Sequence, residues 1–194
     1  MRHSMDERVE NTFLTQIFVQ CDTALIFAAD IKEAVKRRDD PRIWCSIQGF
    51  LVSTANISKM LWPSGQSPVC QERGKRLRTI LSVADSSVIR DKKFRNHFEH
   101  FDERLDRWAE SQNTAPSGLI DGWIAYSKAE FKTELPGLLR VFDATDLTVM
   151  FYGERYPLGP VIEAIEQLAA KVQTVARERL DQKKATIEAR RETK

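Results

Sequence analysis

The stretch RNHFEHFDERLDRW, Arg95 to Trp108, combines an apolar stripe with an unusual concentration of polar side chains. The stripe recurs at steps of four and three residues, the spacing of one face of an amphipathic helix; its members are Phe94, Phe98, Phe101, Leu105 and Trp108. Most other positions near its start can ionise or form hydrogen bonds; these are Arg95, Asn96, His97, Glu99, His100, Asp102 and Glu103. We interpret this helix, expected at about 88–110, as the functional site and the other helices as its scaffold.

The chain before this stretch predicts three further helices. Apolar residues recur with a helical period over 6–38, and Asp40 and Pro41 suit the N-cap and the first position of a second helix. This second helix extends to about residue 62. After residue 42 it contains no acidic residue and only Lys59 as a base, so we expect it to be the most buried helix. A shorter third helix is expected over 68–83, with a basic exposed side.

The chain after this stretch contains turn and strand signals before a last helix. Residues 111–118 are loop by composition, and two segments at 138–142 and 147–152 flank a polar turn and predict a β-hairpin. The apolar stripe of the last helix fades from about residue 182, where we expect a frayed tail. The predicted fold class is mainly α. One domain, 1–194, would form an antiparallel up-and-down bundle of about five helices, with a hairpin-bearing insertion at about 111–159 before the last helix.

Composition and charge exclude several classes of function. The 194 residues carry a net charge of only +2, so any attraction to nucleic acid must be local. Three cysteines without paired spacing argue against a disulfide framework and a zinc site. The sequence shows neither the apolar core of a signal peptide nor a charge-free apolar run of about 20 residues. We therefore expect a cytoplasmic protein that does not bind or span a membrane.

A local basic excess leads into the candidate helix. Between residues 72 and 95 the chain has eight basic and three acidic residues. The basic residues before the motif are Arg73, Lys75, Arg76, Arg78, Arg90, Lys92 and Lys93. We expect these seven side chains to supply contacts to RNA phosphates, because such contacts depend on clustered Lys and Arg rather than on net charge.

Two other interpretations of the candidate helix are a metal site and a structural surface. His97 and His100, three residues apart, could ligate one ion, but the second helix supplies no carboxylate to complete the shell. We therefore expect no metal and no cofactor. A structural surface would place His97 inside and make Arg95 and Glu99 a surface pair worth about 0.3 to 0.5 kcal/mol. It explains less well why Asn96, His100, Glu103 and Arg107 share one face.

The segment Arg95-Asn96-His97-Phe98-Glu99-His100 fits the pattern R-x4-H with a polar residue after the arginine. It resembles the signature of the HEPN (higher eukaryotes and prokaryotes nucleotide-binding) superfamily. The resemblance covers the first four helices and the last one, and it does not cover the insertion. It implies metal-independent RNA cleavage at a dimer interface, here a homodimer through the 95–108 helix.

The resemblance also implies a role for each matching residue. His100 would transfer the proton of the attacking 2′-hydroxyl or of the leaving 5′-oxygen, Arg95 would neutralise the scissile phosphate, and Asn96 would position a phosphate oxygen or the histidine. A toxin or defence protein with an antitoxin partner is one expectation for such a hydrolase. The alternative is a non-catalytic dimeric module that binds a nucleotide, RNA or another protein.

Overall fold

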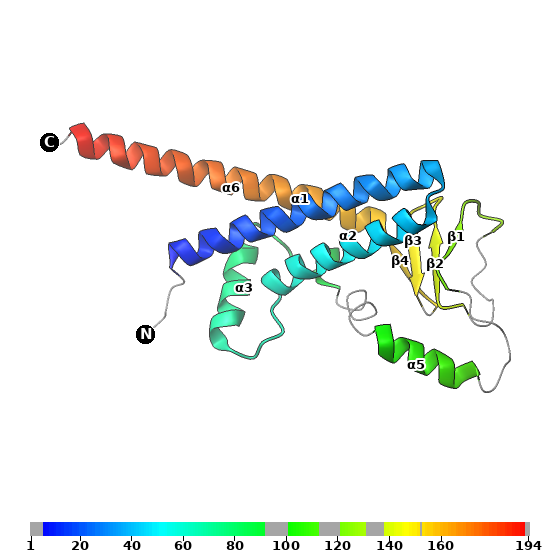
Figure 1. The fold of residues 1–194 in the computed structure, drawn as a ribbon. Helices are drawn as coiled ribbons and strands as arrows, with labels where there is room; N and C mark the ends of the chain where they lie inside the picture. Colours follow the sequence, from blue (N-terminus) through cyan, green and yellow to red (C-terminus); the bar gives the residue numbers. More distant parts are fainter. Residues whose placement is uncertain (1–5, 92–100, 113–120, 131–137, 152, 193–194) are drawn as a thin grey trace.

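The computed structural model describes residues 6–91, 101–112, 121–130, 138–151 and 153–192 (Figure 1). This part of the chain is mainly helical, with a small four-stranded sheet before the last helix. The helices are α1 (Glu7–Arg37), α2 (Asp40–Leu61), α3 (Pro68–Ile80), α5 (Phe101–Gln112) and α6 (Leu158–Glu192), with one short 3-10 helix, η1 (Val88–Arg90). The strands are β1 (Trp123–Ala125), β2 (Arg140–Asp143), β3 (Thr148–Phe151) and β4 (Glu154–Pro157).

The first two helices form an antiparallel hairpin, and the sequence predicts both of them closely. The Asp6 side chain accepts a hydrogen bond from the Arg8 amide and caps α1. Arg38 ends α1 in the left-handed conformation, at φ 52°. The Asp39 side chain then accepts from the Arg42 amide, so Asp39 caps α2 rather than Asp40. A connection of two residues is short enough to require the two helices to lie side by side.

The main core lies between α1, α2 and α6. In Figure 1, α6 runs alongside α1 in the opposite direction and projects past the N-terminal end of α1. The α1 side chains that fill this core are Leu14, Ile17, Cys21, Ala24, Ala28 and Ile31. They meet Ile162, Ile165, Leu168 and Val172 of α6. Ten α2 residues are buried, more than in α1, which confirms the prediction for α2.

The sheet has the strand order β1-β2-β3-β4. β1 pairs with β2 in parallel, whereas β2, β3 and β4 form an antiparallel meander. Ile124, Phe142 and Val149 belong to the main core, and Phe151 and Tyr156 belong to a second cluster that includes α5. The predicted hairpin is confirmed as β2 and β3, but the sheet has two further strands, β1 and β4, that the sequence does not predict. β1 has only three residues, which is too short for an alternating pattern to stand out. β4 ends at Pro157, and proline is a residue that argues against a strand.

The structure corrects two predicted helix boundaries. A helix starting at Val88 is wrong, because the chain forms η1 over Val88–Arg90 and Asp91 is then extended, at φ −60° and ψ 116°. α5 is described from Phe101 onwards, and residues 92–100 lie outside the described part. The last helix also extends beyond the end of its apolar stripe near residue 182, since α6 continues to Glu192. Gln, Lys, Ala, Glu and Arg dominate this tail and favour a helix even where no apolar stripe remains.

Among the described helices, α1 is the one whose length and composition would also suit a membrane span. A core helix of a folded domain passes the same test, and α1 packs against both α2 and α6. The expected absence of a membrane segment stays a prediction.

Candidate nucleic-acid interface

The motif residues Arg95, Asn96 and His100 lie outside the described residues, as do Lys92 and Lys93. The two segments that flank the motif are described. Arg90 and Asp91 precede it, and Phe101 begins α5 directly after His100.

α5 is attached to the sheet by the apolar stripe that the sequence predicts. Phe101, Leu105 and Trp108 are partly buried and pack against a cluster of Leu139, Phe151 and Tyr156. The rings of Phe101 and Phe151 meet edge to face, with centroids 6.1 Å apart. The residue that follows His100 is therefore held against β3.

Arg140 provides a second attachment for the start of α5. Its guanidinium carbon lies 4.7 Å from the centre of the Phe101 ring and 5.1 Å from that of Trp44 in α2. Two hydrogen bonds, of 2.7 and 2.6 Å, join the same guanidinium to the Asp121 carboxylate. Trp44 in turn donates from its indole nitrogen to the Gly122 carbonyl, at 2.8 Å. These contacts connect α2, α5 and the residues before β1.

Four of the predicted RNA-binding residues have partners within the chain, and one of them is Arg90, which donates to the Asp85 carbonyl at 3.0 Å. The Arg73 guanidinium lies 4.5 Å from the centre of the Phe13 ring, and Arg76 forms an ion pair with Glu10. Arg78 donates to the Leu61 carbonyl and pairs with Asp85. Lys75, by contrast, is exposed. The basic side of α3 thus also connects α3 to α1 and to the end of α2.

Arg90, five residues before Arg95 in the sequence, lies on a polar cavity of about 490 Å³. The cavity is lined by Trp62, Pro63, Gln71, Arg78, Asp85 and Arg90. The Trp62 indole donates to the Asp85 carboxylate at 3.0 Å. This hydrogen bond and the charge of Arg78 lower the pKa of Asp85 below its ordinary value. The cavity therefore holds two guanidinium groups against one carboxylate, a balance that favours an anion.

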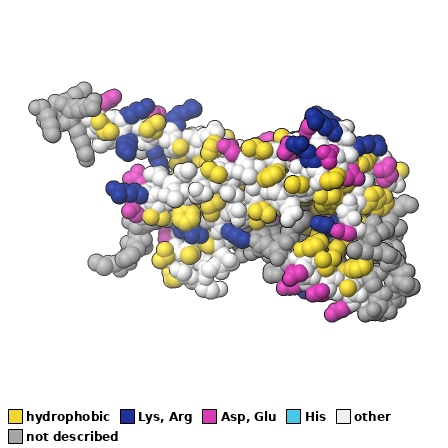
Figure 2. All heavy atoms as spheres, viewed as in Figure 1, with side chains coloured by type: hydrophobic (Ala, Val, Ile, Leu, Met, Phe, Trp, Pro, Cys, Tyr) yellow, Lys and Arg dark blue, Asp and Glu magenta, His cyan; other side chains and the backbone are white. Residues whose placement is uncertain are grey.

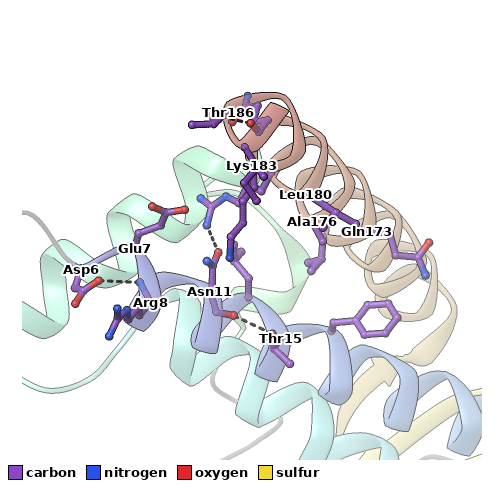
Figure 3. A pocket seen from close by; sticks show the side chains of 16 residues that line it. Asp6, Glu7, Arg8, Asn11, Thr15, Gln173, Ala176, Leu180, Lys183 and Thr186 are labelled. Carbon is purple, nitrogen blue, oxygen red and sulfur yellow. Dashed lines mark hydrogen bonds between the residues drawn. The ribbon is translucent and has the colours of Figure 1, made fainter. Parts of the chain in front are cut away.

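A second cavity lies in a groove between α1 and α6 and has a volume of about 890 Å³ (Figure 3). At its side, Glu10 is almost completely buried, with 1% of its side chain exposed, and pairs with Arg179 of α6 and Arg76 of α3. Arg179 also donates to the Asn11 side chain. Sequence reasoning missed this cluster. The sequence does contain a signal for this cluster. Glu10 lies four residues before Leu14 and seven before Ile17, so it occupies a buried position in the apolar stripe of α1.

Within the described residues, no group of three or more His, Cys, Asp or Glu side chains is arranged to hold a metal ion. His97 and His100 lie outside those residues, so the expectation of no metal stays a prediction. The chain matches no family model, no curated protein and no solved structure.

Proposed function

We propose that this chain is a metal-independent ribonuclease of the HEPN type, built on an up-and-down helical bundle. The observation that carries the proposal is that Phe101, which follows the sequence motif of Arg95, Asn96 and His100, belongs to an anchored helix. Phe101, the next residue, is held by Phe151 and Arg140. On the other side of the motif, Arg90 lines a polar cavity. A catalytic histidine needs such fixed neighbours, because proton transfer requires positioning within hydrogen-bond reach.

The proposed reaction is an internal transesterification of RNA. The 2′-oxygen attacks the neighbouring phosphorus, the bond from phosphorus to the 5′-oxygen breaks, and the products are a 2′,3′-cyclic phosphate and a 5′-hydroxyl. His100 removes the 2′-proton or protonates the 5′-oxygen, because imidazole titrates near pH 6.5 and can act in either direction. Arg95 neutralises the phosphate with a fixed positive charge. Asn96 positions a phosphate oxygen or the histidine.

Arg95 and His100 are five residues apart, or about 140° around an ideal helix, so one helix does not direct both side chains to one point. A second copy of the chain would supply the missing partner. Lys75, Arg90, Lys92 and Lys93 then extend the phosphate contacts away from the motif, with Arg73, Arg76 and Arg78 contributing where their intramolecular contacts allow. A cytoplasmic toxin or defence role, with an antitoxin as partner, belongs to the same proposal.

The second candidate function is a non-catalytic module that binds RNA, a nucleotide or another protein. One specific observation favours it. Arg73, Arg76 and Arg78 contact Phe13, Glu10 and Asp85 of their own chain, which leaves fewer cations free for a phosphate backbone.

Incubation of the purified protein with total cellular RNA in EDTA separates the two candidates. The ribonuclease cuts single-stranded RNA and leaves 2′,3′-cyclic phosphate ends, which resist a phosphomonoesterase until a cyclic phosphodiesterase opens the ring. Intact RNA, together with retained RNA binding, would establish the non-catalytic module instead.

A further inference from the structure

The outer face of the α1–α2 hairpin is uncharged over most of its length. Between residues 13 and 29 of α1 the sequence has one charged residue, Asp22, and between 43 and 58 of α2 it has none, in a chain that is 30% charged overall. The side chains on this face are Val19, Thr23, Ile26, Cys45, Gln48 and Val52, which we call the uncharged face. The exposed Asp22, three residues after Val19 and four before Ile26, lies beside them at the edge of the face. Figure 2 shows its middle as mainly uncharged and hydrophobic side chains, with charged ones gathered mainly towards the two ends.

The apolar members of the uncharged face are large and open to solvent. Ile26 is 63% exposed, Val52 is 51% and Val19 is 44%. They lie on one surface because α1 and α2 pack side by side, with the contact between the two helices running next to these residues. Asn56 donates to Gln20 across this line at 3.2 Å, and the Phe27 ring packs on Gly49.

Two polar groups near the uncharged face already have hydrogen-bond partners within the helices. The Thr23 hydroxyl donates to the Val19 carbonyl at 2.8 Å. The Gln20 carbonyl oxygen already accepts from Asn56. Burying this face therefore costs less than burying an ordinary helix surface, where charged groups would lose their hydration.

We infer that the uncharged face binds the same face of a second copy, forming a twofold-symmetric dimer of α1–α2 hairpins. In a twofold-symmetric dimer the same surface lies on both sides of the interface. A surface with charges of one sign would therefore repel its own copy, whereas an uncharged surface does not. The uncharged length is roughly 25 Å at the helical rise of about 1.5 Å per residue, and two adjacent helices are about 20 Å wide. The pair then buries on the order of 1,000 Å² in total, which is the lower limit for a biological interface and is typical of a weak dimer.

A lipid surface fits this face less well than a second copy does. Helices that lie on membranes carry Lys and Arg along the edges of their apolar face. Here the edge near the start of α2 carries the ion pair between Asp30 and Arg42, at 3.1 Å, followed by Asp39 and Asp40. Charges of both signs at this edge give no net attraction to anionic headgroups.

The inference goes beyond the proposed ribonuclease and does not rest on it. It differs from the expected dimer through the 95–108 helix, because the described apolar residues of that helix, Phe101, Leu105 and Trp108, already pack on the sheet of their own chain.

Light scattering on the full chain tests the inference directly. At roughly 100 μM, well above the micromolar Kd of a weak interface of this size, wild type should have at least the mass of a dimer. Ile26→Glu and Val52→Glu should each halve the wild-type mass, because each places like charges close to the twofold axis. Val69→Glu, at a side chain that is 72% exposed on α3, is the matched control and should keep the wild-type mass. A monomeric wild type, or a mass that both substitutions leave unchanged, would overturn the inference.

The three cysteines provide a second readout that does not depend on how the variants fold. Cys45 is exposed on the uncharged face, Cys70 is partly exposed on α3, and Cys21 is buried, where burial raises the pKa of its thiol to about 12. In wild type, alkylation of Cys45 should slow several-fold as protein concentration rises, while alkylation of Cys70 stays constant. A Cys45 rate independent of concentration contradicts the dimer. Protection of Cys45 by phosphatidylglycerol vesicles, without concentration dependence, would assign the face to a membrane instead.

Discussion

Arg140 holds its guanidinium 4.7 Å from the centre of the Phe101 ring while it binds Asp121 through two hydrogen bonds. The side chain is 21% exposed, so both contacts are partly shielded from water. The contact between a cation and an aromatic ring, and the bidentate pairing of arginine with a carboxylate, are each stronger where water is partly excluded. Arg140 thus joins the strand β2 to the first residue of α5, immediately after the motif segment.

Arg140→Met should loosen α5 from the sheet. The methionine keeps an apolar stem but loses the ring contact and the pair with Asp121, so we expect the free energy of unfolding to fall by about 2 kcal/mol. Denaturant unfolding measures this change. Arg107→Met, at an exposed position on α5 itself, is the control and should change stability by less than about 0.5 kcal/mol. Equal losses in the two variants would show that Arg140 does not hold α5.

The stripe on α5 shows what helical periodicity can and cannot predict. The spacing of Phe101, Leu105 and Trp108 correctly identified an apolar face, because side chains three and four residues apart share one side of a helix. It did not identify the sheet that covers this face. Periodicity describes one element, whereas its partner is determined by residues such as Phe151 and Tyr156, which follow about 50 residues later. Phe151 lies in the predicted strand β3, but nothing in the sequence pairs that strand with α5, and Tyr156 lies in β4, which has no strand signal of its own.

Glu10→Gln should destabilise the junction of α1, α3 and α6. The carboxylate is buried between Arg76 and Arg179, and its removal leaves two guanidinium groups without their counter-charge. Breaking a buried pair in this way costs about 3 kcal/mol. For a domain of this size the melting temperature should fall by roughly 6 to 12 °C. Thermal unfolding followed by circular dichroism measures the shift.

The matched control for Glu10 is Glu7→Gln, one turn earlier on the exposed side of α1. It removes the same charge from the same helix end and should leave the melting temperature nearly unchanged. If the Glu10→Gln and Glu7→Gln variants have the same melting temperature, the buried cluster contributes no net stability.

The turn between β2 and β3 should make stability depend on pH in the acid range. Burial by itself raises the pKa of Asp143, but hydrogen bonds from Lys128 and Thr145 outweigh it, and the pKa lies below its ordinary value. Because the folded pKa is below the unfolded value of about 3.9, this stabilisation is present above pH 4 and is lost as the pH falls through the folded pKa. Urea unfolding between pH 7 and pH 3 measures this loss.

Asp143→Asn identifies the source of that acid dependence. The amide cannot carry the charge that pairs with Lys128, 2.8 Å away, so the variant should be about 1 to 2 kcal/mol less stable at pH 7. The difference in the free energy of unfolding between the variant and wild type should become smaller below pH 4, because wild type loses the same charge there. Asp106→Asn, at an exposed position on α5, should keep the wild-type pH profile. A gap between Asp143→Asn and wild type that stays constant down to pH 3 would contradict the assignment.

The basic stretch shows why the candidate site was harder to predict than the fold. Counting charges correctly located a cluster of Lys and Arg before the motif, but it could not show which of them have partners elsewhere in the chain. Arg76 pairs with Glu10, 66 residues away, and Arg179 reaches the same carboxylate from 169 residues away. Such pairs arise only when α1, α3 and α6 come together, so they leave no local pattern in the sequence.

His100→Ala should abolish RNA cleavage without abolishing RNA binding. The substitution removes a proton-transfer group worth roughly 10² to 10⁴ in rate and leaves the basic residues in place. Arg95→Ala should weaken both binding and cleavage, because it removes a phosphate contact as well as charge stabilisation. Cleavage of a labelled single-stranded RNA in EDTA and binding of an uncleavable 2′-deoxy analogue measure the two effects separately.

Two controls make the histidine test specific. His3→Ala removes the histidine outside the motif and should cut RNA as wild type does. Arg90→Ala, on the polar cavity, should weaken binding about equally for all sequences and reduce the magnitude of the salt slope of binding by about one, while the rate at saturating RNA stays close to wild type. If His100→Ala cuts RNA as fast as His3→Ala, His100 is not the catalytic base or acid, and the ribonuclease proposal for this motif fails even if the protein still binds RNA.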